Sequence, residues 1–205
     1  MKTLVSYLII GLLSVSWLFS QSTEQSYYMK ALGSKIGSMN YYRQTKGEDV
    51  YYQTKSLLEV NLLVKRVKME VENKIHYHAG QFISARSQVV VNGEQNSSSI
   101  IEWAGDHYTI QIDGGEKTTL KSPIFYSGSR LYFDEPKGIQ NAFSESSGVF
   151  MPVNALGAGA YQVTDPRNDR KMIYYYENGV QTKVSIKHPL LTVYLIRDDL
   201  GGAAN

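Results

Sequence analysis

Residues 174–186 read YYYENGVQTKVSI, in which a tyrosine-rich run, an Asn-Gly pair and an alternating run follow one another. The Asn178-Gly179 pair suits a tight turn with positive φ, because Gly adopts such backbone freely and Asn tolerates it. After the turn, alternate residues would share the buried face of a strand: Val180, Thr182, Val184 and Ile186. The stretch therefore predicts a β-hairpin with one buried and one solvated face, which is typical of antiparallel sheets.

The same pattern recurs along most of the chain. Glycine-containing turn signals such as VNGE (91–94) and DGGE (113–116) separate runs with strand-like composition. These runs cover 26–33, 36–45, 50–60, 64–79, 81–91, 97–104, 106–113, 116–121, 160–164, 171–178, 180–187 and 190–197. Regular spacing of this kind predicts an all-β, up-and-down meander: one mainly antiparallel sheet that curves over a single core.

One stretch fits two structures. Leu57, Val60, Val64, Val67 and Val71 have the spacing of a helical stripe, but the same segment also fits two strand registers with a break between them. Its β-branched content and the strand-like runs on either side favour strands.

The first twenty residues predict a secretory signal peptide. Lys2 precedes an apolar run from Leu4 to Phe19, and Ser20 is small enough to lie at a cleavage point. The run is short for an uncleaved anchor, which needs about 20 apolar residues. We therefore expect a periplasmic or secreted protein of a Gram-negative envelope, with one β domain over 21–200 and a disordered tail over 201–205.

Composition excludes several classes of function. The chain has no Cys, so it has no disulfide, thiol nucleophile or lipid-modified cysteine. Removing Lys2 from the 21 basic residues leaves 20 basic and 19 acidic residues. This near balance lacks the excess of basic residues that nucleic-acid binding requires. Lys65, Arg66 and Lys68 fall on both strand parities, which suits the lipid-facing band of an outer-membrane barrel poorly. We expect that the protein binds no nucleic acid and that, after cleavage, it is not an integral membrane protein.

The middle of the chain, 122–159, loses the alternation. It contains three prolines, several glycines and the aromatic run IFYSGSRLYF (124–133). We interpret it as one long connection with short structured pieces, crossing one face or end of the sheet. Connections of this length are often functional, and they also cap cores.

A set of ordered motifs carries a resemblance to a known family. KIGSM (35–39), LYFDEP (131–136), AFSESSGVFMPV (142–153) and YYENG (175–179) occur in the order found in a family of secreted Bacteroidetes proteins, a domain of unknown function. That family is similar to periplasmic half-barrels whose relatives carry lipoproteins or lipids between membranes. The resemblance implies a half-barrel, which is one long curved antiparallel sheet, and the family has no assigned activity.

The candidate ligand site follows from these two expectations. A concave apolar sheet face needs a cover, and 122–159 is long and aromatic enough to supply one. Five aromatic residues would lie against the sheet, and two acids at a polar rim: Tyr126, Tyr132, Phe133, Phe143 and Phe150, with Glu135 and Glu145. The alternative is that these aromatic residues only complete the core.

The sequence evidence for a metal site or a catalytic site is weaker. His76 and His78 share a strand face and offer two imidazoles, but Glu72 and Lys74 on the same face fit an exposed polar surface, so we expect no metal site. Three acids lie near the aromatic run: Asp134, Glu135 and Glu145. Two of them could form a carboxylate pair for glycoside hydrolysis. SESSG (144–148) lacks the leading glycine of a nucleophile elbow. We expect no enzyme and no cofactor.

Two functions remain open. The first is a non-catalytic binding protein for a lipid or another apolar or amphiphilic ligand on the concave face. The second is a structural or interaction module that binds an envelope protein and has no small-molecule ligand.

Overall fold

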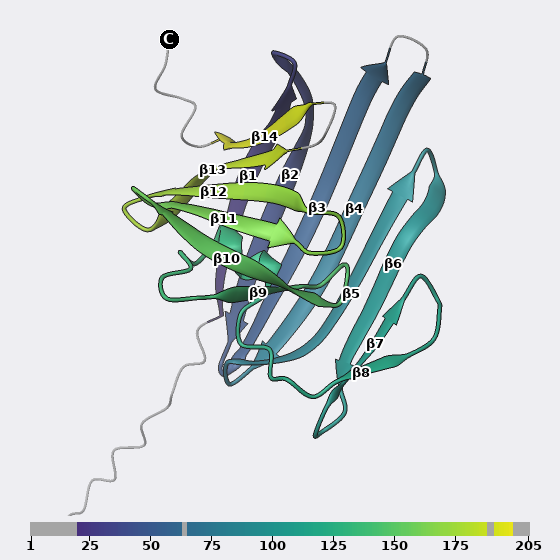
Figure 1. Cartoon of the computed structure of the whole chain (residues 1–205), viewed down its shortest axis with the longest axis vertical. Helices are drawn as coiled ribbons and strands as arrows, with labels where there is room; N and C mark the ends of the chain where they lie inside the picture. The colour runs from purple at the N-terminus through teal and green to yellow at the C-terminus, as the bar shows by residue number, and fades with distance from the viewer. Residues whose placement is uncertain (1–19, 63–64, 188–190, 199–205) are drawn as a thin grey trace, which may run out of the picture.

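The computed structural model describes residues 20–62, 65–187 and 191–198 (Figure 1). Its strands are β1 (Gln21–Ala31), β2 (Ser34–Lys46), β3 (Asp49–Leu62), β4 (Lys65–His78), β5 (Gln81–Val91), β6 (Glu94–Trp103), β7 (Tyr108–Ile112), β8 (Thr118–Leu120), β9 (Asn141–Ser144), β10 (Val149–Gly157), β11 (Ala160–Asp165), β12 (Arg170–Glu177), β13 (Val180–Lys187) and β14 (Thr192–Arg197). A short 3-10 helix, η1, spans Gly128–Tyr132. The predicted signal peptide, apart from Ser20, and the predicted tail lie outside the described residues.

All the strands belong to one sheet with the order β8-β7-β6-β5-β4-β3-β2-β1-β14-β13-β12-β11-β10-β9. Neighbouring strands are antiparallel and consecutive in the chain, except that β1 pairs with β14, with Tyr27 opposite Arg197. The two edge strands, β8 and β9, have only three and four residues. The predicted all-β, single antiparallel sheet is confirmed, and the sheet is not closed.

The sheet bends so that its two halves face each other. In Figure 1, strands β10 to β12 cross in front of the long N-terminal strands at a steep angle. The hydrophobic core lies between the halves in two clusters. One cluster centres on Tyr27, Tyr41 and Tyr132, and the other on Phe82 and Phe143. We call the side of the sheet that faces this core the inner face.

The hairpin at 174–186 forms as predicted, but its faces differ from the prediction. Asn178 and Gly179 have φ of 52° and 79°, as a tight turn requires. The register then shifts between Tyr175 and Tyr176. As a result Gln181 is 1% exposed, whereas Val180 is 43% exposed. Simple alternation fails here because a β-bulge separates Val180 and Gln181, next to the turn, from the rest of β13, so one alternation does not run through the strand.

The segment with two possible structures is a pair of strands. Residues on β3 and β4 pair one by one, from Asp49 opposite His78 to Leu62 opposite Lys65. This confirms the strand interpretation for the described part of the segment. Val64 lies outside the described residues.

The predicted connection over 122–159 is too long. The part outside regular strands runs over 121–140 and contains η1, whereas 141–144 and 149–157 form β9 and β10 within the sheet. In β9, Ala142 packs in the first core cluster and Phe143 in the second, and both are 0% exposed. A strand buried on both faces loses the alternation that sequence reading relies on.

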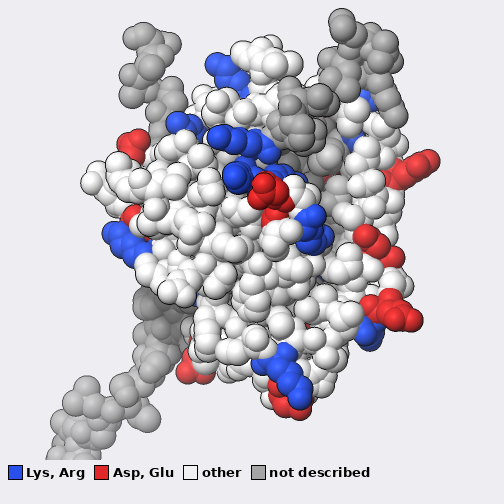
Figure 2. Space-filling view, in the orientation of Figure 1, with Lys and Arg blue, Asp and Glu red and all other residues white. Residues whose placement is uncertain are grey.

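The near face of the molecule mixes acidic and basic side chains. Figure 2 shows basic side chains gathered in the upper part of the near face around an acidic group, with most acidic side chains toward its margins. Within the described ranges, no helix combines the length and the apolar character that crossing a membrane would need.

Candidate functional site

Residues 121–140, which we call the cover segment, lie against the inner face. The segment begins along β5, where the Phe82 amide donates to the carbonyl of Ile124, at 3.4 Å. It continues along β9, where the Phe143 amide donates to the carbonyl of Tyr126, at 2.8 Å. Two strands from opposite halves of the sheet therefore fix the start of the cover segment.

Tyr132 joins η1 to both halves of the sheet. Its ring stacks on Tyr41 with centroids 3.6 Å apart and meets Tyr27 and Tyr174 edge to face. Burial raises the pKa of Tyr41, Tyr132 and Tyr174 well above the ordinary tyrosine value. These hydroxyls therefore stay protonated at neutral pH and serve as hydrogen-bonding groups inside a packed cluster.

An ion cluster holds the end of η1 to the sheet. Asp134 accepts from Arg43 of β2 through Oδ1 at 3.2 Å and from Arg130 through Oδ2 at 3.1 Å. The Arg130 guanidinium lies 4.9 Å from the ring centre of Tyr126, and that of Arg43 lies 5.0 Å from the ring centre of Phe133. Tyr126 and Phe133 thus contribute to anchoring the cover segment.

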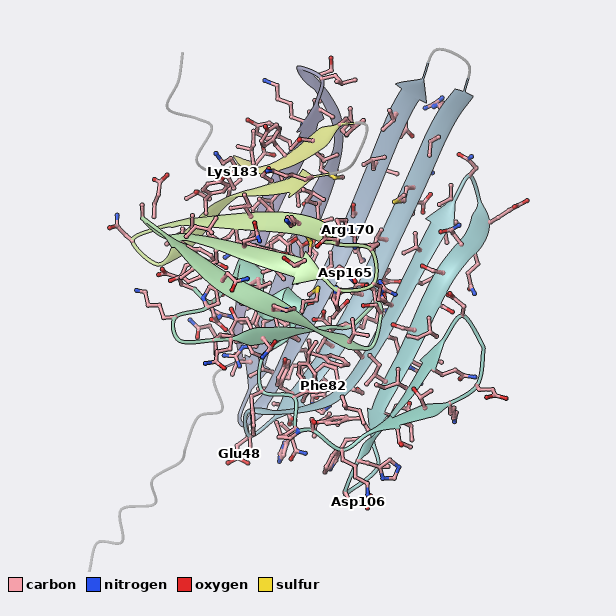
Figure 3. All side chains as sticks on the ribbon, in the orientation of Figure 1. Glu48, Phe82, Asp106, Asp165, Arg170 and Lys183 are labelled. Atoms are coloured by element: carbon pink, nitrogen blue, oxygen red, sulfur yellow. The ribbon has the colours of Figure 1, made fainter. Side chains whose placement is uncertain are left out.

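The remaining two predicted aromatic residues lie in the second core cluster. Phe143 is 0% exposed and meets Phe82 and Phe150 edge to face, with centroids 5.7 and 5.3 Å apart. Phe82 lies in the lower part of the molecule in Figure 3, where β5 begins. The five aromatic residues are therefore brought against the inner face, as predicted, and the contacts described above are those of core residues.

The two predicted rim acids behave differently. Glu135 accepts from the Tyr161 hydroxyl at 2.9 Å and pairs with Lys137 at 3.0 Å, with its side chain 11% exposed. Glu145 is 7% exposed and accepts from the Ser129 amide at 2.8 Å, so its predicted place at a rim is wrong. Its position in the β9–β10 turn, against η1, buries it.

A row of polar residues crosses the inner face at right angles to the strands. Its members are direct cross-strand neighbours on six consecutive strands: Gln25, Tyr41, Thr54, Asn73, Ser87 and Ser99. Five of the six are buried, and Asn73 is half-buried. Neighbours in register present their side chains to the same face, so this polar row forms a continuous belt within an otherwise apolar interior.

Most of the polar row has partners in the protein. Ser99 donates to the carbonyl of Glu145 at 2.6 Å, and Ser87 donates to Oδ1 of Asn73 at 2.5 Å. Gln25 accepts from the Tyr27 hydroxyl at 2.8 Å. The hydroxyl of Thr54 is different, because it is buried and has no hydrogen-bond partner among the described residues.

Beyond the polar row, the inner face is apolar as far as Val60 of β3, Val67 of β4 and Val91 of β5. The half-buried residues of this apolar end are Leu58, Val60, Val67, Met69, Val71, Val89 and Val91, with Ser56 beside Val71. In Figure 1 the upper parts of β3 and β4 extend past β10 to β13. The apolar end thus lies past the polar row, toward these upper ends of β3 and β4.

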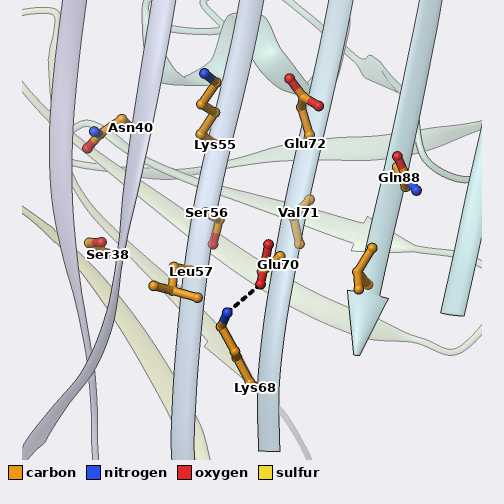
Figure 4. A pocket seen from close by; sticks show the side chains of 11 residues that line it. Ser38, Asn40, Lys55, Ser56, Leu57, Lys68, Glu70, Val71, Glu72 and Gln88 are labelled. Carbon is orange, nitrogen blue, oxygen red and sulfur yellow. Dashed lines mark ion pairs between the residues drawn. The ribbon is translucent and has the colours of Figure 1, made fainter. Parts of the chain in front are cut away.

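The opposite, outer face carries a shallow hollow of about 530 Å³ across β2 to β5 (Figure 4). Its lining mixes both charges with apolar groups, including Lys55, Glu72 and Leu57. Lys68 and Glu70 pair there at 2.6 Å, which raises the pKa of Lys68. The hollow suits contact with a mixed protein surface better than enclosure of an apolar ligand.

The two histidines of β4 both interact with one residue of the neighbouring strand β3, Asp49. His76 Nε2 and His78 Nδ1 both approach Oδ1 of Asp49, at 2.7 and 3.0 Å, and the Tyr51 ring stacks on His76. The described part of the chain contains no group of three or more His, Cys, Asp or Glu residues arranged to hold a metal ion.

Sequence reasoning located the aromatic cover but missed the polar row and the apolar end. A usable signal was present, since tight turns at 79–80 and 92–93 fix the register of β4, β5 and β6 by counting. That count places Asn73 opposite Ser87 once the bulge near Tyr77 is included. The bulge itself has no clear sequence signature.

Comparison with known proteins supports the fold. The chain is similar to the crystal structure of a β-barrel-like protein of domain of unknown function DUF1849 from Brucella abortus, with a TM-score of 0.59, 10% identity, and coverage of 88% of this chain and 96% of that chain. No curated protein sequence matches the chain. Residues 27–198 match the family model described as domain of unknown function DUF6134. The chain therefore belongs to the DUF6134 family.

Proposed function

We propose that the protein is an exported, non-catalytic envelope protein that holds an apolar or amphiphilic ligand on the apolar end of its inner face. The observation that carries the proposal is the run of half-buried apolar residues on β3, β4 and β5, in register with one another and continuing past the polar row. Contiguous apolar surface of this kind marks binding sites in soluble proteins. The signal-like N-terminus and the resemblance to periplasmic carrier half-barrels support export and a lipid-like ligand.

The absence of a role in catalysis is part of the proposal. Asp134 is held by two arginines, Glu135 by Lys137 and Tyr161, and Glu145 by a backbone amide. Each carboxylate therefore has a separate structural partner. General acid–base work instead needs two carboxyl groups facing a common substrate space.

The test uses two neighbouring residues of one strand. Val89 faces inward and Val90 faces outward on β5, and both are half-buried. The mature chain, residues 21–205, is titrated with Nile red, a neutral dye whose fluorescence rises in apolar surroundings. Val89→Glu should weaken dye binding at least about tenfold, equivalent to ~1.4 kcal/mol, and Val90→Glu should leave it unchanged.

Native mass spectrometry of protein purified from its own envelope provides the second measurement. A co-purifying lipid or other apolar molecule, lost in Val89→Glu, supports the proposal. A wild-type protein that binds no dye and carries no such molecule would contradict it.

The outer-face hollow favours one alternative, a protein-interaction module. Exposed Leu57, Tyr51 and Ile100 accompany the mixed charges on that face, with exposures of 40%, 39% and 38%. This function predicts a stoichiometric protein in the same native mass spectra, lost in Leu57→Glu and retained in Val89→Glu.

A further inference from the structure

We infer that the ligand is a single-chain amphiphile with an uncharged, hydrogen-bonding head, and that it binds head inward, with the head at the polar row and the chain along the apolar end. This inference rests on the proposed function and specifies both the ligand class and its direction. Three features of the inner face support it. These are polar groups at the row without a hydrogen-bond partner among the described residues, the lack of charged residues in the row and the apolar end, and the length of the apolar end.

The first feature is hydrogen-bonding capacity next to the apolar end. The Thr54 hydroxyl is buried with no partner, and Asn73 uses Oδ1 to accept from Ser87 while its amide nitrogen donates to no described residue. A buried polar group without a partner costs about 1–3 kcal/mol. Thr54 and Asn73 are direct cross-strand neighbours, so one small polar head, or a water molecule bound with it, can reach both.

The second feature is charge. The polar row and the apolar end contain no Lys, Arg, Asp or Glu. The nearest inner-facing cation in β2, Arg43, pairs with Asp134, a carboxylate that it shares with Arg130. Glu145, whose carbonyl accepts from Ser99 of the row, adds a negative carboxylate nearby. An anionic head buried at the row would find no cation within the row or the apolar end, and burying a charge without a partner is strongly unfavourable. A hydroxyl, amide or glycerol ester needs no such partner.

The third feature is length. From Thr54 to Val60 the inner face of β3 runs six residues, which corresponds to roughly 20 Å at ~3.3 Å per residue. One leaflet of a bilayer gives an acyl chain about half of its ~30 Å hydrocarbon thickness. The apolar end is therefore long enough for the chain of a common single-chain lipid laid along the strands.

The structure also offers a competing place for a head. Arg167 and Arg170 lie on the β11–β12 turn, where both contact the buried carboxylate of Asp165, at 3.0 and 3.6 Å (Figure 3). Their side chains are 46% and 44% exposed. An anionic head bound at these arginines is the competing arrangement.

The experiment compares three ligands of equal chain length as displacers of Nile red at pH 8: dodecanol, dodecanoate and dodecane. Head-inward binding predicts that wild type binds dodecanol at least about tenfold more tightly than dodecane, as one net hydrogen bond of ~1.4 kcal/mol requires. It also predicts dodecanoate to be weaker than dodecanol. Dodecyl chains with a bulky fluorophore on the head should bind more weakly than chains with the same fluorophore at the tail.

Variants locate the head. Asn73→Leu should remove the preference for dodecanol while leaving dodecane binding intact, and Thr54→Val, which is nearly isosteric, should reduce the preference if Asn73→Leu does not fold. Asn40→Leu is the matched control, because Asn40 lies on the outer face of β2 beside the hollow. It should bind like wild type.

The outcomes separate the two proposals. Equal binding of the three ligands overturns the head-inward inference and leaves the proposed function standing. Tightest binding of dodecanoate, lost in Arg170→Ala, also overturns the inference and places an anionic head at the arginines. Binding of none of the ligands, nor of Nile red, contradicts both.

Discussion

The rings of Tyr41 and Tyr132 stack with centroids 3.6 Å apart and an interplanar angle of 19°. Tyr41 belongs to β2, and Tyr132 ends the 3-10 helix of the cover segment. The two residues are far apart in the chain, so this stack is a tertiary contact between the sheet and its cover. It fixes η1 over the polar row, of which Tyr41 is a member.

Truncating Tyr132 should therefore be costly. Tyr132→Ala removes a buried ring in contact with three other tyrosines, and core truncations of this size cost about 3–5 kcal/mol. The control is Phe125→Ala in the same segment, where the ring is 65% exposed. In urea unfolding, the free energy of unfolding should fall by this amount in Tyr132→Ala and change by no more than about 0.5 kcal/mol in Phe125→Ala. Equal losses would mean that Tyr132 lines an open pocket.

The ion cluster at Asp134 should matter more than a surface ion pair. Asp134→Ala leaves the partly buried Arg43 and Arg130 without their shared carboxylate, with an expected loss of about 1–3 kcal/mol. Glu102→Ala breaks a more exposed pair with Arg86, at 3.5 Å, and should cost about 0–1 kcal/mol. Thermal or urea unfolding of both variants measures the difference, and a loss from Asp134→Ala no larger than the loss from Glu102→Ala would refute the anchoring role.

Two glycines with the same backbone conformation should respond differently to substitution. Gly148 and Gly114 have φ of 68° and 69°, so Ala is strained at both. A Cβ at residue 148 would lie 2.7 Å from Cγ2 of Ile110, whereas a Cβ at residue 114 meets nothing within 4 Å. Gly148→Ala should lower the free energy of unfolding by about 1–3 kcal/mol more than Gly114→Ala, because Ile110 must move. Equal effects would show that the β9–β10 turn does not pack firmly on β7.

The buried carboxylate of Asp165 gives a pH dependence of known sign. The Arg167 side chain lowers the pKa of Asp165 below its ordinary 3.8. Stability from this group is therefore present above the unfolded pKa and is lost as the pH falls through the lower folded value. Asp165→Asn should be less stable than wild type at neutral pH by about 1–2 kcal/mol, with the difference narrowing below pH 3.8.

Asp169→Asn is the control for this prediction. Residue 169 is exposed on the same turn and has φ of 53°, which Asn tolerates. Its urea-unfolding curves should follow those of wild type across the same pH series. A gap between Asp165→Asn and wild type that stays constant to low pH would argue against a carboxylate with a lowered pKa.

The sequence predicts those parts of the fold that depend only on residues close to one another in the chain. Asn178-Gly179 sets a hairpin, and the alternation on β7 sets a buried face, because both depend on a few neighbouring residues. Prediction fails where distant residues change the environment. Ala142 and Phe143 are buried on opposite faces of one strand, and Gln181 turns inward because of a bulge. Glu145 is buried because η1 packs over it.

The candidate site shows the same division. The aromatic residues of the cover segment can be found from composition, since so many rings in one connection need a surface to pack against. The polar row depends on the pairing of six strands, so each of its members looks unremarkable alone. Thr54 and Asn73 become neighbours only through the register of β3 and β4.

The pairing of β1 with β14 affects how the chain is made. Synthesis proceeds from the N-terminus, and each strand from β2 to β8 can pair with its predecessor as soon as it leaves the ribosome. The other edge of β1 must wait for Thr192–Arg197, the last of the described strands. Until then the growing chain carries a long strand with an unpaired hydrogen-bonding edge, which is a template for pairing with other chains. A chaperone that binds extended segments would protect the nascent protein most at Gln21–Ala31.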